Sequence, residues 1–190
     1  MNTGSLTLAA GLSGLLLLAA CGGPPPDPMA AKNAAAVKAD SAAKAMVAAQ
    51  EETFRKIFEM FNTGNTEGIE DLVAADFVDH QQPPEITTTG IQGARDVIAY
   101  FRSVMPDLHQ EMIRTATNGD ISFVHYHMSG TFTGPMGEMP PNGKKMDVMG
   151  VDVVRFADGK MVEHWGYIEE MKMMQQLGMM PPPDAAAKKK

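Results

Sequence analysis

The spacing of apolar residues changes near residue 107, and this change restricts the chain to folds that combine helices with a sheet. Before it, the apolar positions recur at i, i+3, i+4 and i+7, as on one face of a helix: Phe54, Ile57, Phe58 and Phe61. After it, stretches rich in Val, Ile, Met, Phe and Thr are separated by turn signals such as Asp158-Gly159, which is typical of antiparallel strands in sequence order.

These patterns predict an α+β fold in which three N-terminal helices pack on a curved antiparallel sheet. The first helix ends at Gly64, the second carries Ile69, Leu72 and Val73, and the third runs from Ala94 to Phe101. The expected strands cover four ranges: 108–117, 121–133, 145–156 and 160–168. A last helix over 170–177 ends at Gly178. A cone-shaped pocket is expected between the sheet and the helices.

The first twenty residues are typical of a bacterial lipoprotein signal peptide, because an apolar stretch is followed by Leu18-Ala19-Ala20-Cys21. Cys21, the only cysteine, would then be the lipidated N-terminus. The other predicted parts are an Ala/Pro-rich tether over 21–43, one domain over 44–180 and a disordered tail over 181–190. This signal peptide predicts a cell-envelope protein that is lipid-anchored to a membrane, which would be the outer membrane if the cell has two.

The charge of the chain argues against a nucleic-acid partner. Its formal net charge is −7 and its pI is near 5.2, whereas phosphate binding requires a basic face. The only basic run, Lys188-Lys189-Lys190, reads as a solvated tail. We therefore expect a small apolar ligand, with a homodimer as a further possibility.

A series of short motifs resembles the SnoaL-like polyketide cyclase or ester cyclase family of the nuclear transport factor 2-like superfamily. The motifs are Asn118-Gly119-Asp120, 129–134 (SGTFTG), 140–143 (PPNG), 151–156 (VDVVRF), Asp158-Gly159-Lys160, Glu163-His164-Trp165 and Gln176-Leu177-Gly178. The resemblance implies cofactor-free acid/base catalysis by a carboxylic acid at the end of the last strand, which would be Glu169 in this chain. It leaves a catalytic protein and a non-catalytic binding or scaffold protein both open.

Strand alternation predicts that Trp165, Tyr167 and Glu169 share one face, which we assign to the pocket. If Asp158-Gly159 is a two-residue hairpin loop, Asp152 lies opposite Trp165 on that face; a three-residue loop would place Asp152 opposite His164. Burial beside aromatic rings would raise the pKa of Glu169. In the alternative, the two aromatic residues belong to the core and Glu169 only begins the following helix.

The resemblance also implies a role for His80, which could polarise a carbonyl group or orient a carboxylate; the alternative is a loop histidine without a catalytic role. Phe132 stands where relatives often have His. Together with Tyr126, Trp165 and Tyr167, it is expected to bind the substrate.

No cofactor or metal ion is expected. His125 and His127 share a strand face, but no third ligand follows at a recognisable spacing. The methionines near the C-terminus, such as Met171 and Met174, could offer thioethers to Cu(I), but their spacing fits the apolar stripe of a helix better. No phosphate-binding loop or nucleophile elbow is found.

Overall fold

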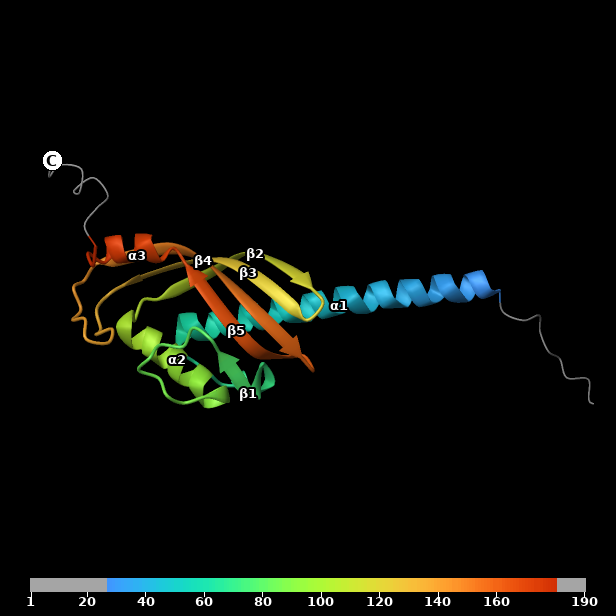
Figure 1. The fold of residues 1–190 in the computed structure, drawn as a ribbon, viewed down its shortest axis with the longest axis horizontal. Coiled ribbons are helices and arrows are strands. Elements are labelled where there is room, and N and C mark those ends of the chain that lie inside the picture. The colour runs from blue at the N-terminus through green and yellow to red at the C-terminus, as the bar shows by residue number, and fades with distance from the viewer. Residues whose placement is uncertain (1–26, 181–190) are drawn as a thin grey trace, which may run out of the picture. The chain divides into compact units, whose positions relative to one another are not determined.

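The structure is a computed structural model that describes residues 27–180 (Figure 1). The predicted signal peptide, the lipidation site Cys21 and the predicted tail lie outside these residues. The chain divides into two compact units, Met1–Lys38 and Ala39–Lys190. In the first, the described residues from Pro28 on belong to helix α1 and are exposed. The second contains all the other elements.

Three α-helices have the predicted positions, and the first is longer than its apolar pattern. Helix α1 covers Pro28–Thr63, although burial begins only at Gln50. It ends as expected at Gly64, whose φ of 78° is a conformation that favours glycine. Helix α2 covers Gly90–Val104 and α3 covers Glu170–Gln176. Within residues 27–180, no helix combines the length and hydrophobicity needed to cross a membrane.

The second predicted helix is wrong in detail. Ile69–Asp71 form only a 3-10 turn, and the chain then enters strand β1, Val73–Asp79. Three apolar residues at helical spacing fit a single turn as well as a helix, and periodicity cannot separate the two over so short a run. Strand β1 finds its hydrogen-bond partner in the last strand of the sheet, far away in sequence.

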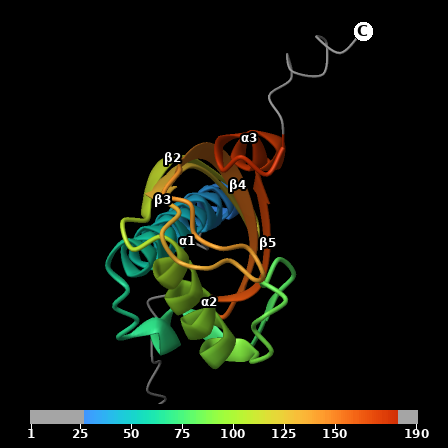
Figure 2. The same cartoon turned by 90° about the vertical axis from the view of Figure 1, so that its left-hand side faces the viewer.

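The remaining strands follow the prediction closely: β2 His109–Asn118, β3 Ile121–Thr131, β4 Lys145–Ala157 and β5 Lys160–Ile168. The sheet order is β1-β5-β4-β3-β2, with neighbours antiparallel except for β1, which runs parallel to β5. Figure 2 shows the sheet curving over α2 and the part of α1 that packs inside it. The α+β fold class is confirmed, with a mixed five-stranded sheet.

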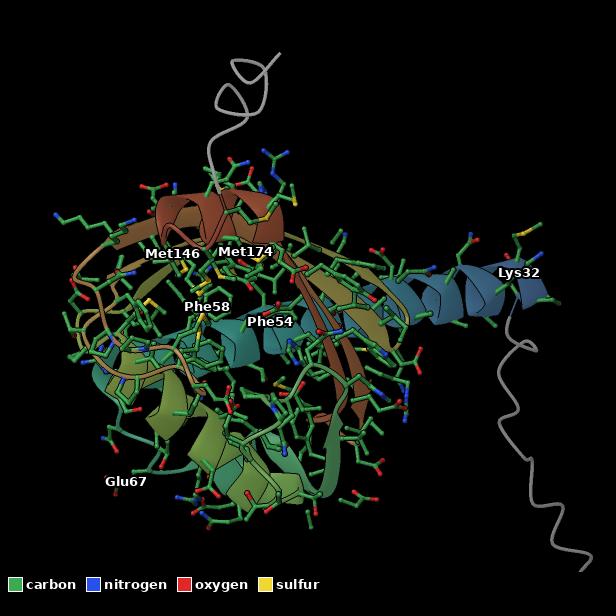
Figure 3. All side chains as sticks on the ribbon, turned by 60° about the vertical axis from the view of Figure 1, so that its left-hand side comes forward. Lys32, Phe54, Phe58, Glu67, Met146 and Met174 are labelled. Carbon is green, nitrogen blue, oxygen red and sulfur yellow. The ribbon has the colours of Figure 1, made fainter. Side chains whose placement is uncertain are left out.

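The core lies between the concave face of the sheet and the helices. Phe54 and Phe58 of α1 and Met146 of β4 point into it (Figure 3) and are almost fully buried. The ring of Phe58 meets Tyr126 of β3 edge to face at 5.3 Å between centroids, a favourable arrangement for aromatic pairs. This packing holds α1 against the middle of the sheet.

Candidate active site

A cavity of about 240 Å³ opens inside the cone. Its wall is mostly apolar, with aromatic side chains from α1 and α2 and methionines from the sheet and α3. The polar side chains in the wall are few: Asp79, Gln81, Gln110, Tyr126, Asp152 and His164. An apolar cavity with a few convergent polar groups is the usual form of a small-molecule site.

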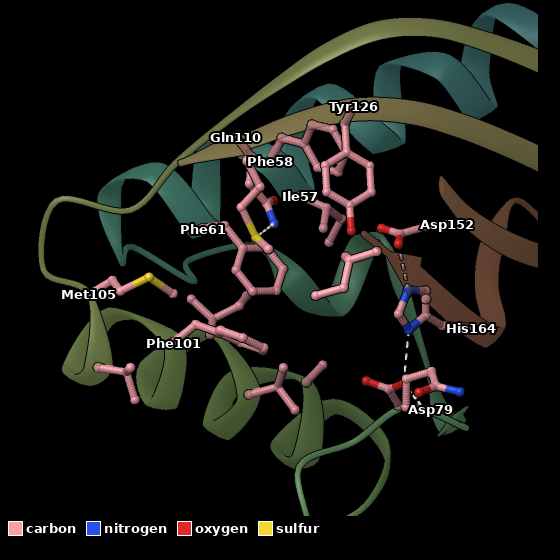
Figure 4. A pocket seen from close by; sticks show the side chains of 18 of the residues that line it. Ile57, Phe58, Phe61, Asp79, Phe101, Met105, Gln110, Tyr126, Asp152 and His164 are labelled. Carbon is pink, nitrogen blue, oxygen red and sulfur yellow. Dashed lines mark hydrogen bonds and ion pairs between the residues drawn. The ribbon is translucent and has the colours of Figure 1, made fainter. Parts of the chain in front are cut away.

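Three of these side chains, Asp79, Asp152 and His164, form an acid/base cluster at one side of the cavity (Figure 4). The imidazole lies between the two carboxylates. Its Nδ1 is 2.8 Å from Asp79 Oδ1 and its Nε2 is 3.6 Å from Asp152 Oδ1. The exposed fractions of the side chains are 10% for Asp79, 16% for Asp152 and 20% for His164, so water screens their charges only partly.

The strand pairing brings the acid/base cluster together. Asp79, at the end of β1, pairs with His164 of β5 in parallel register. Asp152 of β4 pairs with Gly166 of β5, two residues beyond His164 on the same face. A Cβ on Gly166 would lie 3.3 Å from both Asp152 Oδ1 and His164 Cε1. The missing side chain therefore leaves space directly beside the two groups.

The carboxylates hold His164 in its charged form. Burial alone would lower the pKa of the imidazole, but its interactions with Asp152 and Asp79 outweigh burial and raise the pKa to about 10. Burial is the largest single effect on Asp79 and acts to raise its pKa, but the hydrogen bond and charge interaction with His164 and the hydrogen bond from the Gln81 N–H together outweigh burial and lower the pKa below its ordinary value. At neutral pH the cluster contains an imidazolium that carries a proton on each ring nitrogen.

Tyr126 adds a hydroxyl group beside Asp152 (Figure 4). Burial, followed by the charge of Asp152 and a hydrogen bond to it, strongly raises the pKa of the phenol, which therefore stays protonated and donates to the carboxylate. The ring needs the glycine opposite it on β4, because a Cβ on Gly150 would overlap the ring. Tyr126 thus orients Asp152 from the neighbouring strand.

The predicted pocket face of β5 is wrong. Trp165 and Tyr167 point away from the cavity, and Tyr167 is 57% exposed. The loop after β4 has the expected two residues, since Ala157 pairs with Lys160, but Arg155 pairs with Glu163 while Phe156 pairs with Met161. Val162 is therefore an extra residue in β5, a β-bulge, and a bulge reverses the facing of the residues beyond it. His164 faces the cavity, and Asp152 lies opposite Gly166 instead of Trp165.

Glu169 is also outside the cavity, so the predicted raised pKa is wrong. Its carboxylate accepts a hydrogen bond from the Met149 N–H at 2.9 Å and pairs with Lys172 at 2.9 Å. These contacts, the one with Lys172 first, lower the pKa of Glu169. Glu169 begins helix α3 without a side-chain capping bond, close to the alternative that the sequence left open.

His80 does not reach the cavity. Its ring stacks on Trp165 at 4.6 Å between centroids, and its Nε2 lies 3.0 Å from Glu163 Oε2. All three side chains belong to the outer face, by which we mean the sheet surface away from the cavity. A histidine pinned there cannot polarise a ligand carbonyl inside the cone, and the catalytic role predicted for it is not supported by its position.

Of the residues singled out in the sequence, Asp152, Tyr126 and Phe132 line the cavity. His164 and Asp79 also line the cavity, although the sequence patterns did not predict them as site residues. Strand alternation correctly placed His164 and Trp165 on opposite faces of β5, but the face of Trp165 was assigned to the pocket instead of the face of His164. Among residues 27–180, no group of three or more His, Cys, Asp or Glu side chains is arranged to hold a metal ion. His127 instead pairs with Asp147 at 3.1 Å.

Comparison with known proteins points to one family. The family model for the SnoaL-like polyketide cyclases matches residues 51–177. The nogalonic acid methyl ester cyclase of Streptomyces nogalater is 22% identical over 119 residues, which cover 62% of this chain and 89% of the cyclase. The structure of TsrD from Streptomyces laurentii has a TM-score of 0.62 at 24% identity over 72% of this chain and 97% of its own. The structure of IdmH from Streptomyces antibioticus has a TM-score of 0.57 at 26% identity over 68% of this chain and 98% of its own.

Proposed function

The chain belongs to the SnoaL-like polyketide cyclase family, and from this premise we propose that its cavity catalyses cofactor-free proton transfer at the carbon next to a carbonyl group. The family suggests a cyclase-like or isomerase-like role, and both reactions begin by forming an enolate. The observation that carries the proposal is the carboxylate of Asp152 beside the imidazolium of His164 in an apolar cavity.

Each member of the acid/base cluster has a distinct task. Asp152 accepts the α-proton of the substrate as general base. At 3.6 Å from Asp152, the Nε2 N–H of His164 is beyond hydrogen-bond distance, so it is available to donate to the carbonyl oxygen. As the α-proton leaves, this oxygen becomes an enolate, and the imidazolium stabilises its negative charge. Asp79 holds His164 through Nδ1, and Tyr126 orients Asp152.

The charge of the cluster selects uncharged substrates. Two carboxylates and one imidazolium leave a net charge of −1 at the cavity wall. Among the residues described as lining the cavity, His164 is the only cationic side chain. A carboxylate or phosphate on the ligand would therefore be repelled in a poorly solvated site. A small, mostly apolar ketone or ester fits both the wall and its charge.

Deuterium exchange tests the proposal without knowledge of the natural substrate. Proton NMR in D₂O would follow the loss of the α-proton signals of a panel of simple ketones and esters. The wild-type protein should accelerate exchange above the buffer rate for compounds that it binds. If the protein binds these compounds but accelerates exchange for none of them, the proposed catalysis is refuted and a non-catalytic ligand-binding protein is favoured.

We also infer from the sequence pattern around Cys21 that the domain is lipid-anchored in the cell envelope. Cys21→Ser removes the thiol that would carry the lipid. The variant should move from the detergent phase to the aqueous phase in Triton X-114 partitioning of whole-cell extracts, because a single thiol determines the anchor. Mass spectrometry of the wild-type protein should find lipid on Cys21. Unlipidated, water-soluble wild-type protein would contradict the anchor.

The outer face supports the inference of a homodimer. Large apolar side chains from different strands are exposed there: Ile113, Phe123, Met149 and Tyr167. Large apolar side chains exposed on one face of a sheet favour an interface with another protein surface. Phe123→Glu should convert a dimer into a monomer in light scattering coupled to size exclusion, because the carboxylate would be buried without a partner. An unchanged mass for Phe123→Glu, or a monomeric wild type, would exclude this interface.

A further inference from the structure

One polar side chain in the cavity wall, Gln110, has an unsatisfied atom. Gln110 lies on β2, is 9% exposed and lines the cavity. Its Oε1 is buried and has no hydrogen-bond partner among the described residues. Buried polar atoms without a partner are rare, because losing water costs free energy that only a new hydrogen bond restores. The oxygen therefore lacks a hydrogen-bond donor, and none of the described residues provides one.

The side chain is held so that this oxygen remains free. Its Nε2 is 3.5 Å from the sulfur of Met128 (Figure 4). A thioether can accept a hydrogen bond but cannot donate one, so the amide nitrogen belongs beside the sulfur and the oxygen is left over. Asn62 holds the backbone of the same residue through two hydrogen bonds, of 2.7 Å to the N–H and 3.0 Å to the carbonyl oxygen.

Gln110 and Asp152 enter the cavity from different strands, β2 and β4, with apolar side chains such as Ile57 and Phe58 also lining it (Figure 4). We propose that the substrate is an uncharged hydroxy ketone whose hydroxyl group, at a distance from the carbonyl, donates a hydrogen bond to Oε1 of Gln110. This inference rests on the proposed function in placing the carbonyl group at the acid/base cluster. It makes Gln110 a specificity-determining residue.

Calorimetric titration of the full-length protein with two matched series of ligands tests the proposal. One series runs from pentan-2-one to decan-2-one, and the other carries a terminal hydroxyl group on each chain. Each pair differs by one hydrogen-bond donor, and the series samples the unknown distance between the two ends of the site. At the best length, the hydroxyl group should tighten binding to the wild type about tenfold or more, since a site with an unpaired acceptor discriminates strongly in favour of the donor.

Gln110→Met keeps the length of the side chain and removes the acceptor. In this variant the preference for the hydroxylated series should vanish or reverse, because the hydroxyl group would be buried without a partner. Met112→Leu, a change of a half-buried residue on the same strand that does not line the cavity, is the matched control and should keep the preference. Thermal unfolding of both variants shows whether they are folded.

Three results would overturn the proposal: equal affinity of the two series for the wild type, a hydroxyl preference that survives in Gln110→Met, or no binding of any member. None of these depends on turnover. A clear hydroxyl preference without α-proton exchange would leave the role of Gln110 in place and refute the proposed catalysis. Exchange of the α-proton without a hydroxyl preference would support the proposed catalysis and refute the role of Gln110.

Discussion

Asp152→Asn is expected to lower the rate of α-proton exchange roughly 100-fold or more. Asparagine keeps the size of the side chain and can still hydrogen-bond with Tyr126, but its amide cannot accept the α-proton. The affinity for the ketone should change little, because the substitution removes an interaction that matters mainly in the transition state. The measurement is proton NMR in D₂O at saturating ketone, with the dissociation constant determined separately by calorimetry.

Glu169→Gln is the matched control for this experiment. It makes the same kind of change at the carboxylate favoured by the sequence pattern, which the structure places outside the cavity beside Lys172. Exchange should remain at the wild-type rate in this variant. Undiminished exchange in Asp152→Asn would refute the assignment of the base, and loss of exchange in Glu169→Gln would return that role to Glu169.

The free energy of unfolding is expected to fall by about 3 kcal/mol between pH 6.5 and pH 9. The pKa of His164 is about 10 in the folded protein and has an ordinary value of 6.5. The folded state therefore holds a proton that the unfolded state releases over this range. The stabilisation is complete below the unfolded pKa of 6.5 and is lost as the pH rises through the folded pKa of about 10. Urea unfolding followed by circular dichroism measures the change.

At acidic pH, the free energy of unfolding changes with pH in the opposite direction. The lowered pKa of Asp79 stabilises the fold above its ordinary value of 3.8, and this contribution is lost as the pH falls further. The combined stabilisation from Asp79 and His164 should thus be highest between their two ordinary values, 3.8 and 6.5.

His164→Gln separates this effect from the titration of other groups. Glutamine can still donate to Asp79 but does not titrate, so the decline between pH 6.5 and pH 9 should become much smaller. The variant will be less stable overall, because two carboxylates then lie close together without a cation. The prediction concerns only the slope against pH, and an identical slope in wild type and variant would show that His164 is not held charged by the fold.

Much of the fold could be predicted from local patterns. The four strands from β2 to β5 and the C-terminal ends of α1 and α3 follow from apolar periodicity, turn residues and glycines, which act within a few residues of their own position. Strand β1 could not be predicted in this way. It is short, follows a 3-10 turn, and owes its conformation to pairing with β5, an interaction between segments about ninety residues apart.

The site shows the same division on a finer scale. Asp152, Tyr126 and Phe132 were placed in the pocket correctly, but the face of β5 was inverted by one bulged residue, Val162. The bulge is visible in the pairing of β5 with β4, but nothing in the amino-acid sequence of β5 indicates it. Because side chains alternate with a period of two, one inserted residue exchanges the two faces completely. The face of Trp165 and Glu169 was preferred because the family resemblance pointed to Glu169, and only the pairing register shows that His164 faces the cavity instead.

The amino-acid sequence by itself determined the α+β class, the family and the turns that shape the sheet, since these depend on short-range spacing and on motifs. Only the tertiary structure decided which side chains meet. Asp79, Asp152 and His164 come from three strands, and their convergence depends on a parallel pairing and a register shift. The raised pKa of His164 depends on that convergence, because charge interactions and desolvation act between neighbours in space, whatever their distance along the chain.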